Sequence, residues 1–219
     1  MTRLAVFDCD GTLVDSQANI CRAMAEAFRL SGLEPPPDTA TRRIVGLSLV
    51  EAMRALLPDG DAAAHKRLAR DYKDMFRALR ADGALDPEPL FPGVAEALDR
   101  LRAQGWALGV ATGKSDRGLA HVLATHGIAD RFLTLQTADR HPSKPDPSMA
   151  LAAMAEAGAT PEASVMIGDT SFDMAMGRAA RTRAVGVAWG YHAVSELIEA
   201  GADVVATDAR QLPHLLEAS

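Results

Sequence analysis

The sequence predicts an α/β protein with a doubly wound parallel sheet and an all-helical segment inserted after the first strand. Three observations lead to this fold class. Short apolar runs alternate with amphipathic helical stretches over most of the 219 residues. These runs lack polar alternation, which is typical of parallel strands covered by helices on both faces. One long interval, by contrast, has helical periodicity and no convincing strand.

Six apolar runs have the length and composition of buried strands. They are Leu4–Phe7, Ala107–Ala111, Phe132–Gln136, Ser164–Ile167, Ala184–Val187 and Val204–Ala206. Helical stretches lie between most of them, so we expect parallel strands joined by crossovers.

Amphipathic segments that end on a glycine separate several of these strands. Glycine suits the left-handed backbone that commonly closes a helix. The clearest segments are GVAEALDRLRAQG (93–105), DRGLAHVLATHG (116–127) and DPSMALAAMAEAG (146–158). Helices of this kind on both faces of the sheet give a doubly wound architecture.

The interval from Ser16 to about Ala81 breaks this rhythm. It reads as helical stretches at 16–32, 41–57 and 61–81, with three consecutive prolines after the first stretch. The segment ALDPEPLFPG then leads back to the α/β pattern, and its three prolines make it a stiff linker.

We therefore expect a core domain of residues 1–15 and 86–219 and a helical domain of residues 16–85, which has the size of a small domain. The alternative is that the apolar residues of the insert belong to one shared core.

Composition limits the classes of function. Hydrophobic residues make up 48% and charged residues 24% of the chain, as in ordinary globular proteins. The net charge of -6 disfavours a nucleic-acid partner. No run reaches the length of a membrane span, and the chain opens with strand material rather than a signal peptide. The two cysteines, Cys9 and Cys21, form no CxxC pair, so we expect a cytoplasmic protein.

Polar residues follow four of the predicted strands, where ligands bind in an open parallel sheet. Asp8 and Asp10 follow the first strand, and Thr112, Gly113 and Lys114 follow the second.

Lys144 lies between two prolines after the third strand, and Asp169 and Asp173 follow the fourth. We expect the four acids, the hydroxyl of Thr112 and a lysine to meet at one end of the sheet. Carboxylates without a histidine or cysteine cluster suit a hard divalent cation, above all Mg²⁺. A lysine and a threonine beside it can hold phosphoryl oxygens, and one aspartate can attack phosphorus.

These motifs resemble those of the haloacid dehalogenase-like (HAD) hydrolase superfamily. DCDGTLVDS, the threonine of VATGK, the lysine of SKPDP and the acid pair of GDTSFD occur in that family's order. The resemblance covers essentially the whole chain and implies a Rossmann-like core. The helical insert is similar to the C1 cap of the branch that includes phosphoglycolate phosphatases.

The resemblance implies a role for each matching residue. Asp8 would be the nucleophile. Asp10 would be the general acid and base. Thr112, Gly113 and Lys144 would bind the phosphoryl group, with Lys144 also restraining Asp8.

The implied metal is Mg²⁺, held by Asp8, Asp10, Asp169 and Asp173. Asp10 would contribute its backbone carbonyl. Asp173 would act through a water molecule or as a partner of Lys144.

Residues of the cap are harder to interpret. Gly46 lies where related phosphatases place a substrate-facing loop, and Arg43 is nearby, so we expect both to bind substrate. A solvated basic face is the alternative for the arginine. Cys9 is expected to be a small buried residue, and no role can be assigned to it or to His141. Lys66 lies in a charged helix with no special context.

We expect a Mg²⁺-dependent phosphatase that hydrolyses a small, phosphoglycolate-like metabolite through an aspartyl phosphate. The alternatives are a sugar phosphomutase of the same superfamily and a non-hydrolytic binding or regulatory protein. Mutases usually have valine where Thr12 stands, and a binding protein has no need of Asp10 as acid and base. No membrane partner is expected, and the oligomeric state cannot be inferred.

Overall fold

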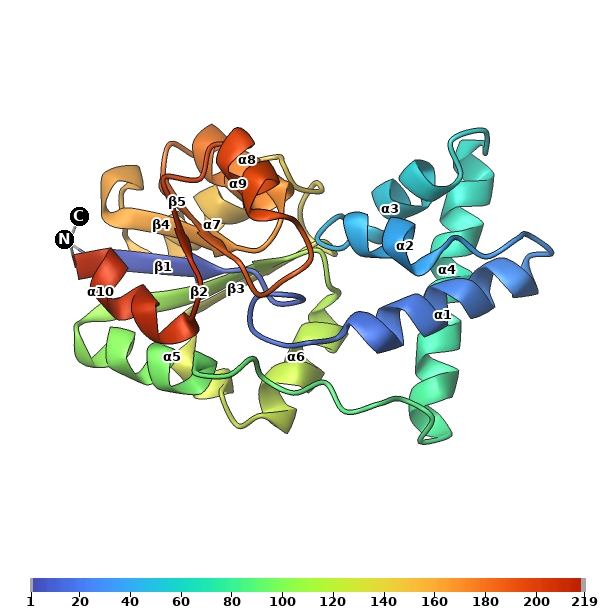
Figure 1. Ribbon diagram of the computed structural model, residues 1–219, viewed down its shortest axis with the longest axis horizontal. Coiled ribbons are helices and arrows are strands. Elements are labelled where there is room, and N and C mark those ends of the chain that lie inside the picture. The colour runs from blue at the N-terminus through green and yellow to red at the C-terminus, as the bar shows by residue number, and fades with distance from the viewer. Residues whose placement is uncertain (1, 218–219) are drawn as a thin grey trace.

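The computed structural model describes residues 2–217 and has an α/β lobe and a helical lobe (Figure 1). The α/β lobe is built on a six-stranded parallel sheet of order β3-β2-β1-β4-β5-β6. The strands are β1 (Arg3–Phe7), β2 (Trp106–Thr112), β3 (Thr134–Thr137), β4 (Ser164–Gly168), β5 (Arg183–Val187) and β6 (Val204–Ala206). The predicted fold class is confirmed.

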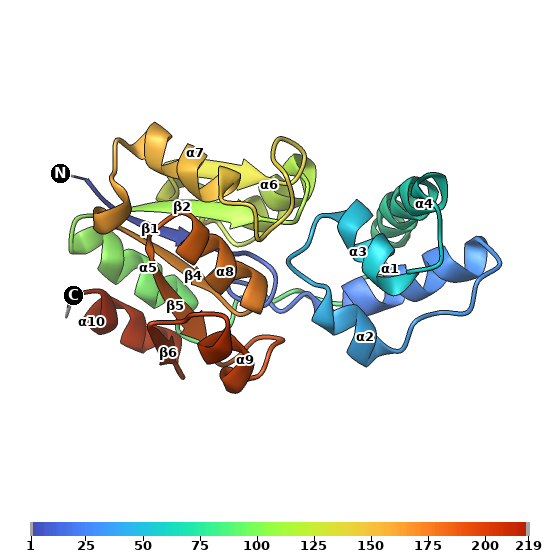
Figure 2. The same ribbon diagram turned by 90° about the horizontal axis from the view of Figure 1, so that it is seen from above.

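Helices cover both faces of the sheet because its central strand is apolar on both sides. Leu4 and Val6 of β1 belong to one buried cluster, and Ala5 and Phe7 belong to another. Helices α7 (Ser148–Ala157), α8 (Ser171–Ala179) and α9 (Val194–Glu199) lie on the first side, and α5 (Val94–Ala103), α6 (Asp116–Thr125) and α10 (Leu212–Glu217) on the second (Figure 2). Short 3₁₀ turns are η1 (Ala129–Arg131), η2 (Pro161–Ala163) and η3 (Ala209–Gln211).

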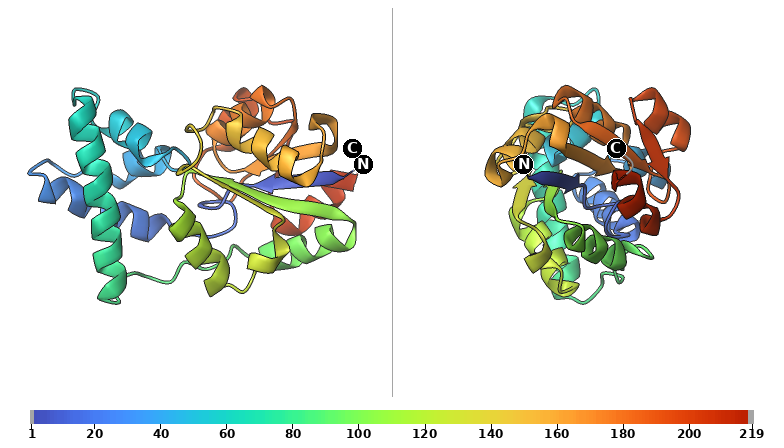
Figure 3. Two further views of the ribbon diagram at one scale, coloured as in Figure 1. Left: turned by 180° about the vertical axis from the view of Figure 1, so that it is seen from behind. Right: turned by 90° about the vertical axis from the view of Figure 1, so that its left-hand side faces the viewer.

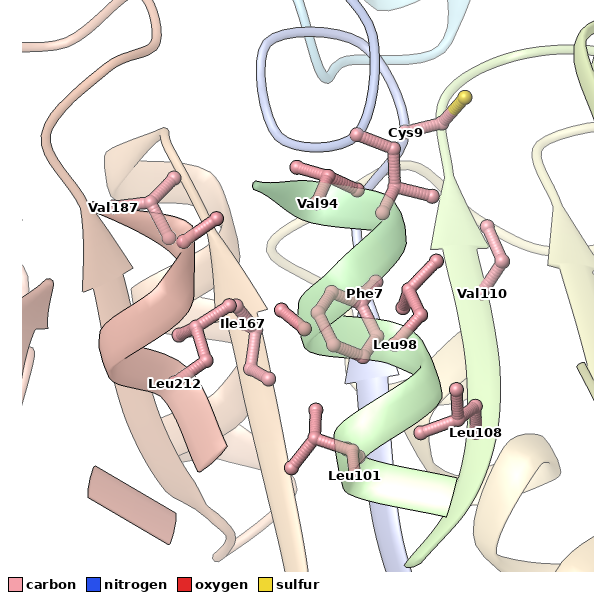
Figure 4. Close-up of a cluster of buried hydrophobic side chains, with 14 of the residues drawn as sticks. Phe7, Cys9, Val94, Leu98, Leu101, Leu108, Val110, Ile167, Val187 and Leu212 are labelled. Carbon is pink, nitrogen blue, oxygen red and sulfur yellow. The ribbon is translucent and has the colours of Figure 1, made fainter. Parts of the chain in front are cut away.

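The larger cluster is centred on α5. Its side chains Leu98 and Leu101 pack against Phe7 of β1 and Leu108 of β2 (Figure 4). Cys9 belongs to the same cluster and is fully buried, as expected for a small apolar residue. Burial also raises the pKa of its thiol well above the ordinary value.

The third strand differs from its predicted position. It begins at Thr134 and ends at Thr137, whereas Phe132–Gln136 was expected. The turn η1 ends only at Arg131, so Phe132 and Leu133 run beside β2 before the regular ladder begins at the pair Gly109–Thr134. The backbone N–H of Leu133 still donates to Leu108 O at 2.8 Å.

The insert consists of α1 (Gln17–Leu30), α2 (Asp38–Arg43), α3 (Leu49–Leu56) and α4 (Ala62–Ala81). The single helix predicted at 41–57 is wrong, because the chain breaks into α2 and α3. Gly46 has φ of +98°, a left-handed conformation that cannot continue a helix. Ser48 is extended and begins the new helix.

The helices of the insert pack around their own buried cluster, which includes Met24, Phe28, Met53, Leu68 and Tyr72. This lobe lies at the carboxyl ends of the strands, whereas β1 begins and α10 ends at the opposite side of the sheet (Figures 1 and 3). The domain boundaries at 15/16 and 85/86 remain our proposal. Within residues 2–217, no helix has the length and hydropathy to cross a membrane.

Two chain segments connect the lobes and are hydrogen-bonded to each other. Asp15 N donates to Pro89 O at 2.9 Å, and Phe91 N donates to Leu13 O at 3.0 Å. The side chain of Asn19 bonds both the N–H and the carbonyl of Asp86 at 2.9 Å. This paired connection, which we call the neck, fixes where the helical lobe meets the sheet.

Shortening a side chain at the centre of the core tests this packing. Leu98→Ala should lower the free energy of unfolding by about 2–5 kcal/mol, because a fully buried leucine leaves a cavity. Leu30→Ala is the control, since Leu30 is 66% exposed and should change stability by less than about 0.5 kcal/mol. Urea unfolding measures both. Equal losses would contradict the assigned core.

Candidate active site

The polar residues that follow the strands lie at one end of the sheet. The direction of the strand order changes there between β1 and β4. Asp8 directly follows β1, Thr112 ends β2 and Asp169 directly follows β4. Lys144 arrives from the loop after β3, and Asp173 from the first turn of α8. All five side chains are buried, so the expected convergence of these residues occurs.

Three of the four acids predicted to bind metal form one cluster. Asp8, Asp169 and Asp173 each offer a carboxylate oxygen, and these oxygens lie within 4.8 Å of one another. The carboxylate of Asp10 is not in this cluster. Its side chain points instead to a different set of partners.

Lys144 supplies the positive charge that touches this cluster. Its Nζ lies 2.8 Å from Asp8 Oδ1 and 2.6 Å from Asp173 Oδ1. Burial acts to lower the pKa of Lys144, but the negative charges of Asp173 and Asp8 outweigh it and raise the pKa above its ordinary value. One lysine cannot balance three ionised carboxylates.

The electrostatics of Asp8 and Asp169 reflect this imbalance. Burial raises the pKa of Asp8 to about 7, against the opposing effect of Lys144. Burial also raises the pKa of Asp169 well above its ordinary value, and repulsion from Asp173 and Asp8 adds to the rise. Within residues 2–217, Asp8 Oδ2 has no hydrogen-bond partner, and Asp8 Oδ1 contacts the ammonium group of Lys144. Buried, unbonded oxygens beside further carboxylates are the donor set that a hard divalent cation requires.

The two other acids are held by neighbouring groups. Thr12 Oγ1 donates to Asp169 Oδ1 at 2.8 Å, and Tyr191 N donates to Asp169 Oδ2 at 2.9 Å. A side chain at Gly11, which has φ of +88°, would overlap the Asp169 carboxylate. This close approach explains the glycine of the first motif.

Asp173 also begins α8 through a capping box. Thr170 donates to Asp173 Oδ2 with its N–H at 3.0 Å and its hydroxyl at 2.7 Å, and Asp173 N in turn bonds Thr170 Oγ1. Since Asp173 Oδ1 contacts Lys144, both oxygens of this carboxylate are already engaged within the chain.

The carboxylate of Asp10 has partners that the sequence did not reveal. Lys114 Nζ lies 2.8 Å from Asp10 Oδ1, and the Ser16 hydroxyl donates to the same oxygen. Burial acts to lower the pKa of Lys114, but the charge of Asp10 outweighs it and raises the pKa above its ordinary value. Ser16 occupies the N-cap position of α1 without capping it. The sequence feature that could have indicated this pairing is the position of Lys114, two residues after Thr112 at the end of the second strand.

The residues predicted to bind substrate are only partly brought together. Thr112 accepts a hydrogen bond from Lys114 N at 3.2 Å. A side chain at Gly113 would overlap the carbonyls of Gly46 and Leu47, so the loop between α2 and α3 presses directly on the end of β2. Gly46 is therefore beside the site.

Arg43 lies elsewhere, as does His141. Arg43 pairs with Glu196 of α9 at 2.5 Å, and its side chain is 65% exposed. His141 bonds Ser148 Oγ through Nδ1 at 2.8 Å and Gln136 Oε1 through Nε2 at 2.9 Å. These contacts tie the loop after β3 to α7 and involve none of the clustered acids.

A cavity of about 590 Å³ separates the two lobes beside these residues. Asp10, Gly113 and Lys114 line its core side, and residues of α1, α3 and α4 line its cap side. A smaller cavity of about 280 Å³ lies at the neck near His121 and Glu88 and shares Arg80 with the larger one. The larger cavity is the substrate-sized space next to the acids.

Comparison with known proteins agrees with this geometry. Residues 5–187 match the family described as haloacid dehalogenase-like hydrolase. The chain is 36% identical over 209 residues to a protein of Dickeya dadantii (strain 3937) named probable phosphatase IndB, covering 94% of this chain and 89% of that one. It is 30% identical over 215 residues to a phosphoglycolate phosphatase of Nitrosococcus oceani, covering 97% and 96%.

A solved structure of a haloacid dehalogenase-like hydrolase from Bacteroides fragilis superposes with a TM-score of 0.87 at 26% identity, covering 97% of this chain and 100% of that one. The fold, the family match and the related phosphatases agree with the motifs at the strand ends. The chain therefore belongs to the haloacid dehalogenase-like hydrolase family of enzymes.

Proposed function

We propose that this phosphatase hydrolyses a small phosphomonoester with Mg²⁺ and through an acyl phosphate formed on Asp8. The observation that carries the proposal is the state of Asp8, which is fully buried, with Oδ1 2.8 Å from Lys144 Nζ and with Oδ2 lacking a hydrogen-bond partner among the described residues. An oxygen free of hydrogen bonds keeps its electron pair available for attack on phosphorus.

In the first step, an Asp8 oxygen forms a bond to phosphorus as the bond from phosphorus to the leaving oxygen breaks. Asp10 gives its proton to that oxygen, so the product leaves as an alcohol. In the second step, Asp10 takes a proton from water while the water oxygen bonds to phosphorus. The bond between phosphorus and Asp8 breaks as this bond forms, which releases inorganic phosphate and restores Asp8 as a carboxylate and Asp10 as a carboxylic acid.

Lys114 and Ser16 position Asp10 for these proton transfers. Both bond the same oxygen, Asp10 Oδ1, so the other oxygen remains to exchange the proton. Thr112, the backbone of Gly113 and Lys144 are the groups we assign to the transferred phosphoryl oxygens.

Asp8, Asp169 and the backbone of Asp10 are the residues that would hold Mg²⁺. When bound, this ion supplies positive charge to the phosphoryl oxygens and to the crowded carboxylates. Both oxygens of Asp173 are already engaged by Thr170 and Lys144, so we assign Asp173 to positioning Lys144.

The name of the Nitrosococcus oceani relative makes phosphoglycolate the first substrate to test. A phosphomutase would return a phosphorylated product, whereas the proposed enzyme releases inorganic phosphate. A binding protein would do neither. The cytoplasmic location and the absence of a nucleic-acid partner remain predictions.

Removal of metal tests the role of the acidic cluster. Excess EDTA should lower hydrolysis of p-nitrophenyl phosphate by about 10²-fold or more, and Mg²⁺ should restore it, because the clustered acids need a cation. Asp169→Asn should raise the Mg²⁺ concentration needed for half-maximal rate. Asp130→Asn, at an exposed turn, is the control and should not. Full activity in chelator would refute metal dependence.

Two neighbouring substitutions separate the roles of the first two acids. Asp8→Asn should abolish turnover and form no phosphoenzyme. Asp10→Asn should slow turnover by about 10²–10⁴-fold, since it removes general acid–base help. With p-nitrophenyl phosphate, whose leaving group barely needs a proton, phosphoenzyme should accumulate in Asp10→Asn.

Rapid-quench mass spectrometry detects the added phosphoryl group and maps it to a peptide. The peptide that contains Asp8 should carry it in the Asp10→Asn protein. A phosphoryl group on Asp169, or continued turnover of Asp8→Asn, would reject the assignment.

A further inference from the structure

One wall of the large cavity is a row of cationic side chains on a single helix. The cationic residues of α4 that line the cavity are Lys66, Arg70, Lys73, Arg77 and Arg80. Their spacing alternates between four and three residues, so at 3.6 residues per turn they fall within about 80° of one another. Helix α4 runs transverse to the strands of the sheet (Figure 1).

The cavity is strongly positive although the chain as a whole has a net charge of -6. Its lining contains seven lysines and arginines and only two acids; the core contributes Lys114 and Arg117 to the cations, and the acids are Asp10 and Asp139. Both acids are already paired, since Asp10 contacts Lys114 at 2.8 Å and Asp139 contacts Lys73 at 3.4 Å. The remaining positive charge has no counterpart in the lining.

Several cations of this row have no acidic partner within the described residues 2–217. Lys66, Arg70 and Arg80 form no ion pair there, and Arg80 Nε is buried without a hydrogen-bond acceptor. Arg77 of the row does have an acidic partner, since it pairs with Asp74 at 2.9 Å, three residues earlier on α4.

Like charges three and four residues apart on a helix repel each other and destabilise it. If these cations served only to keep the helix surface solvated, they would not need to lie on the face that lines the cavity. Arg67 is exposed like Lys66, Arg70 and Arg77, but it lies on α4 outside the cavity lining. The row has the properties of a binding surface for an anion.

Apolar side chains lie in the same cavity as the cations. They include Ile20 and Met24 of α1, Ile44 of the loop after α2, and Tyr72 and Phe76 of α4. A volume of about 590 Å³ falls within the range of pockets that bury ligands of drug size. A two-carbon phosphate ester would leave both the apolar surface and most of the cationic row without contacts.

We propose that the substrate carries a second anionic group, separated from the reacting phosphate by an apolar spacer, and that the cationic row of α4 binds this group. The proposal rests on the proposed phosphatase function and specifies its substrate class. The reacting phosphate would lie at Lys144 and Thr112. The spacer would lie against Ile20, Met24 and Ile44, and the second anion would pair with guanidinium and ammonium groups of α4.

A series of synthetic substrates tests the spacer. The bisphosphates of ethane-1,2-diol through hexane-1,6-diol vary the separation between two anions, and the matching alkyl monophosphates lack the second anion. We expect kcat/KM to rise by tenfold or more from phosphoglycolate to the best bisphosphate, and each bisphosphate of favourable length to exceed its monophosphate. This advantage should shrink at high ionic strength, because salt screens charge pairing.

Variants of α4 locate the second subsite. The double variants Lys66→Gln/Arg70→Gln and Arg77→Gln/Arg80→Gln remove the two ends of the row. At least one should lower kcat/KM for the best bisphosphate by about tenfold or more, the loss expected for hydrogen bonds to a charged group. Hydrolysis of p-nitrophenyl phosphate should change by less than threefold. Arg67→Gln is the matched control and should change neither substrate.

Different outcomes would refute the proposed phosphatase function and the proposed second anion-binding subsite. If wild-type enzyme with Mg²⁺ hydrolyses no phosphomonoester, the proposed function fails. If it hydrolyses p-nitrophenyl phosphate but prefers phosphoglycolate to every bisphosphate, the spacer is refuted. If both double variants lose activity equally on bisphosphate and p-nitrophenyl phosphate, or if neither loses activity, the cationic row does not bind a second anion of the substrate.

Discussion

The rest of the structure depends on an excess of negative charge at a buried place. Asp8, Asp169 and Asp173 meet where water is excluded, and the ammonium group of Lys144 offsets only part of their charge. Desolvated like charges are costly, so a chain retains such a cluster when a cation and an anionic substrate make use of it. The parallel sheet makes the cluster possible, because strands far apart in the sequence end side by side.

Charge is distributed unequally between the two lobes. The core supplies the acids, whereas the cavity wall formed by α4 is cationic. The lobes touch at several polar points between these regions. Ser48 N donates to Ser143 Oγ at 2.8 Å, and Lys73 contacts Asp139 at 3.4 Å. The first contact ties the insert to the loop that carries Lys144, so the position of the insert and the position of this lysine are linked.

The sequence was sufficient for the features that local pattern or motif order determines. Unbroken apolar runs predicted the strands, and the polar residues after them predicted the convergence of Asp8, Lys144 and Asp169. The start of β3 was missed by two residues, because the turn η1 delays the ladder. The break between α2 and α3 was missed because a glycine inside an apolar helical pattern is usually tolerated, and only its positive φ ends the helix.

The pairing of Lys114 with Asp10 could not be predicted, since it depends on how two strand ends lie in space. The cationic row had a readable spacing in the sequence. Whether the row lines the cavity depends on the orientation of α4, and the packing of α4 against α1 and α3 fixes this orientation. Arg43 shows the reverse case, because this basic residue, near a loop that we expected to face the substrate, pairs instead with Glu196.

The neck has a consequence for how such enzymes diversify. The chain leaves the core beside Leu13 and returns beside Phe91, and these two positions are hydrogen-bonded neighbours. The length of the chain between Leu13 and Phe91 does not change the separation of these two residues, because they are hydrogen-bonded to each other. Insertions, deletions or wholesale replacement of the intervening helices therefore leave the strand register undisturbed. Evolution can therefore exchange the helical lobe while the sheet and the residues at its strand ends are inherited unchanged.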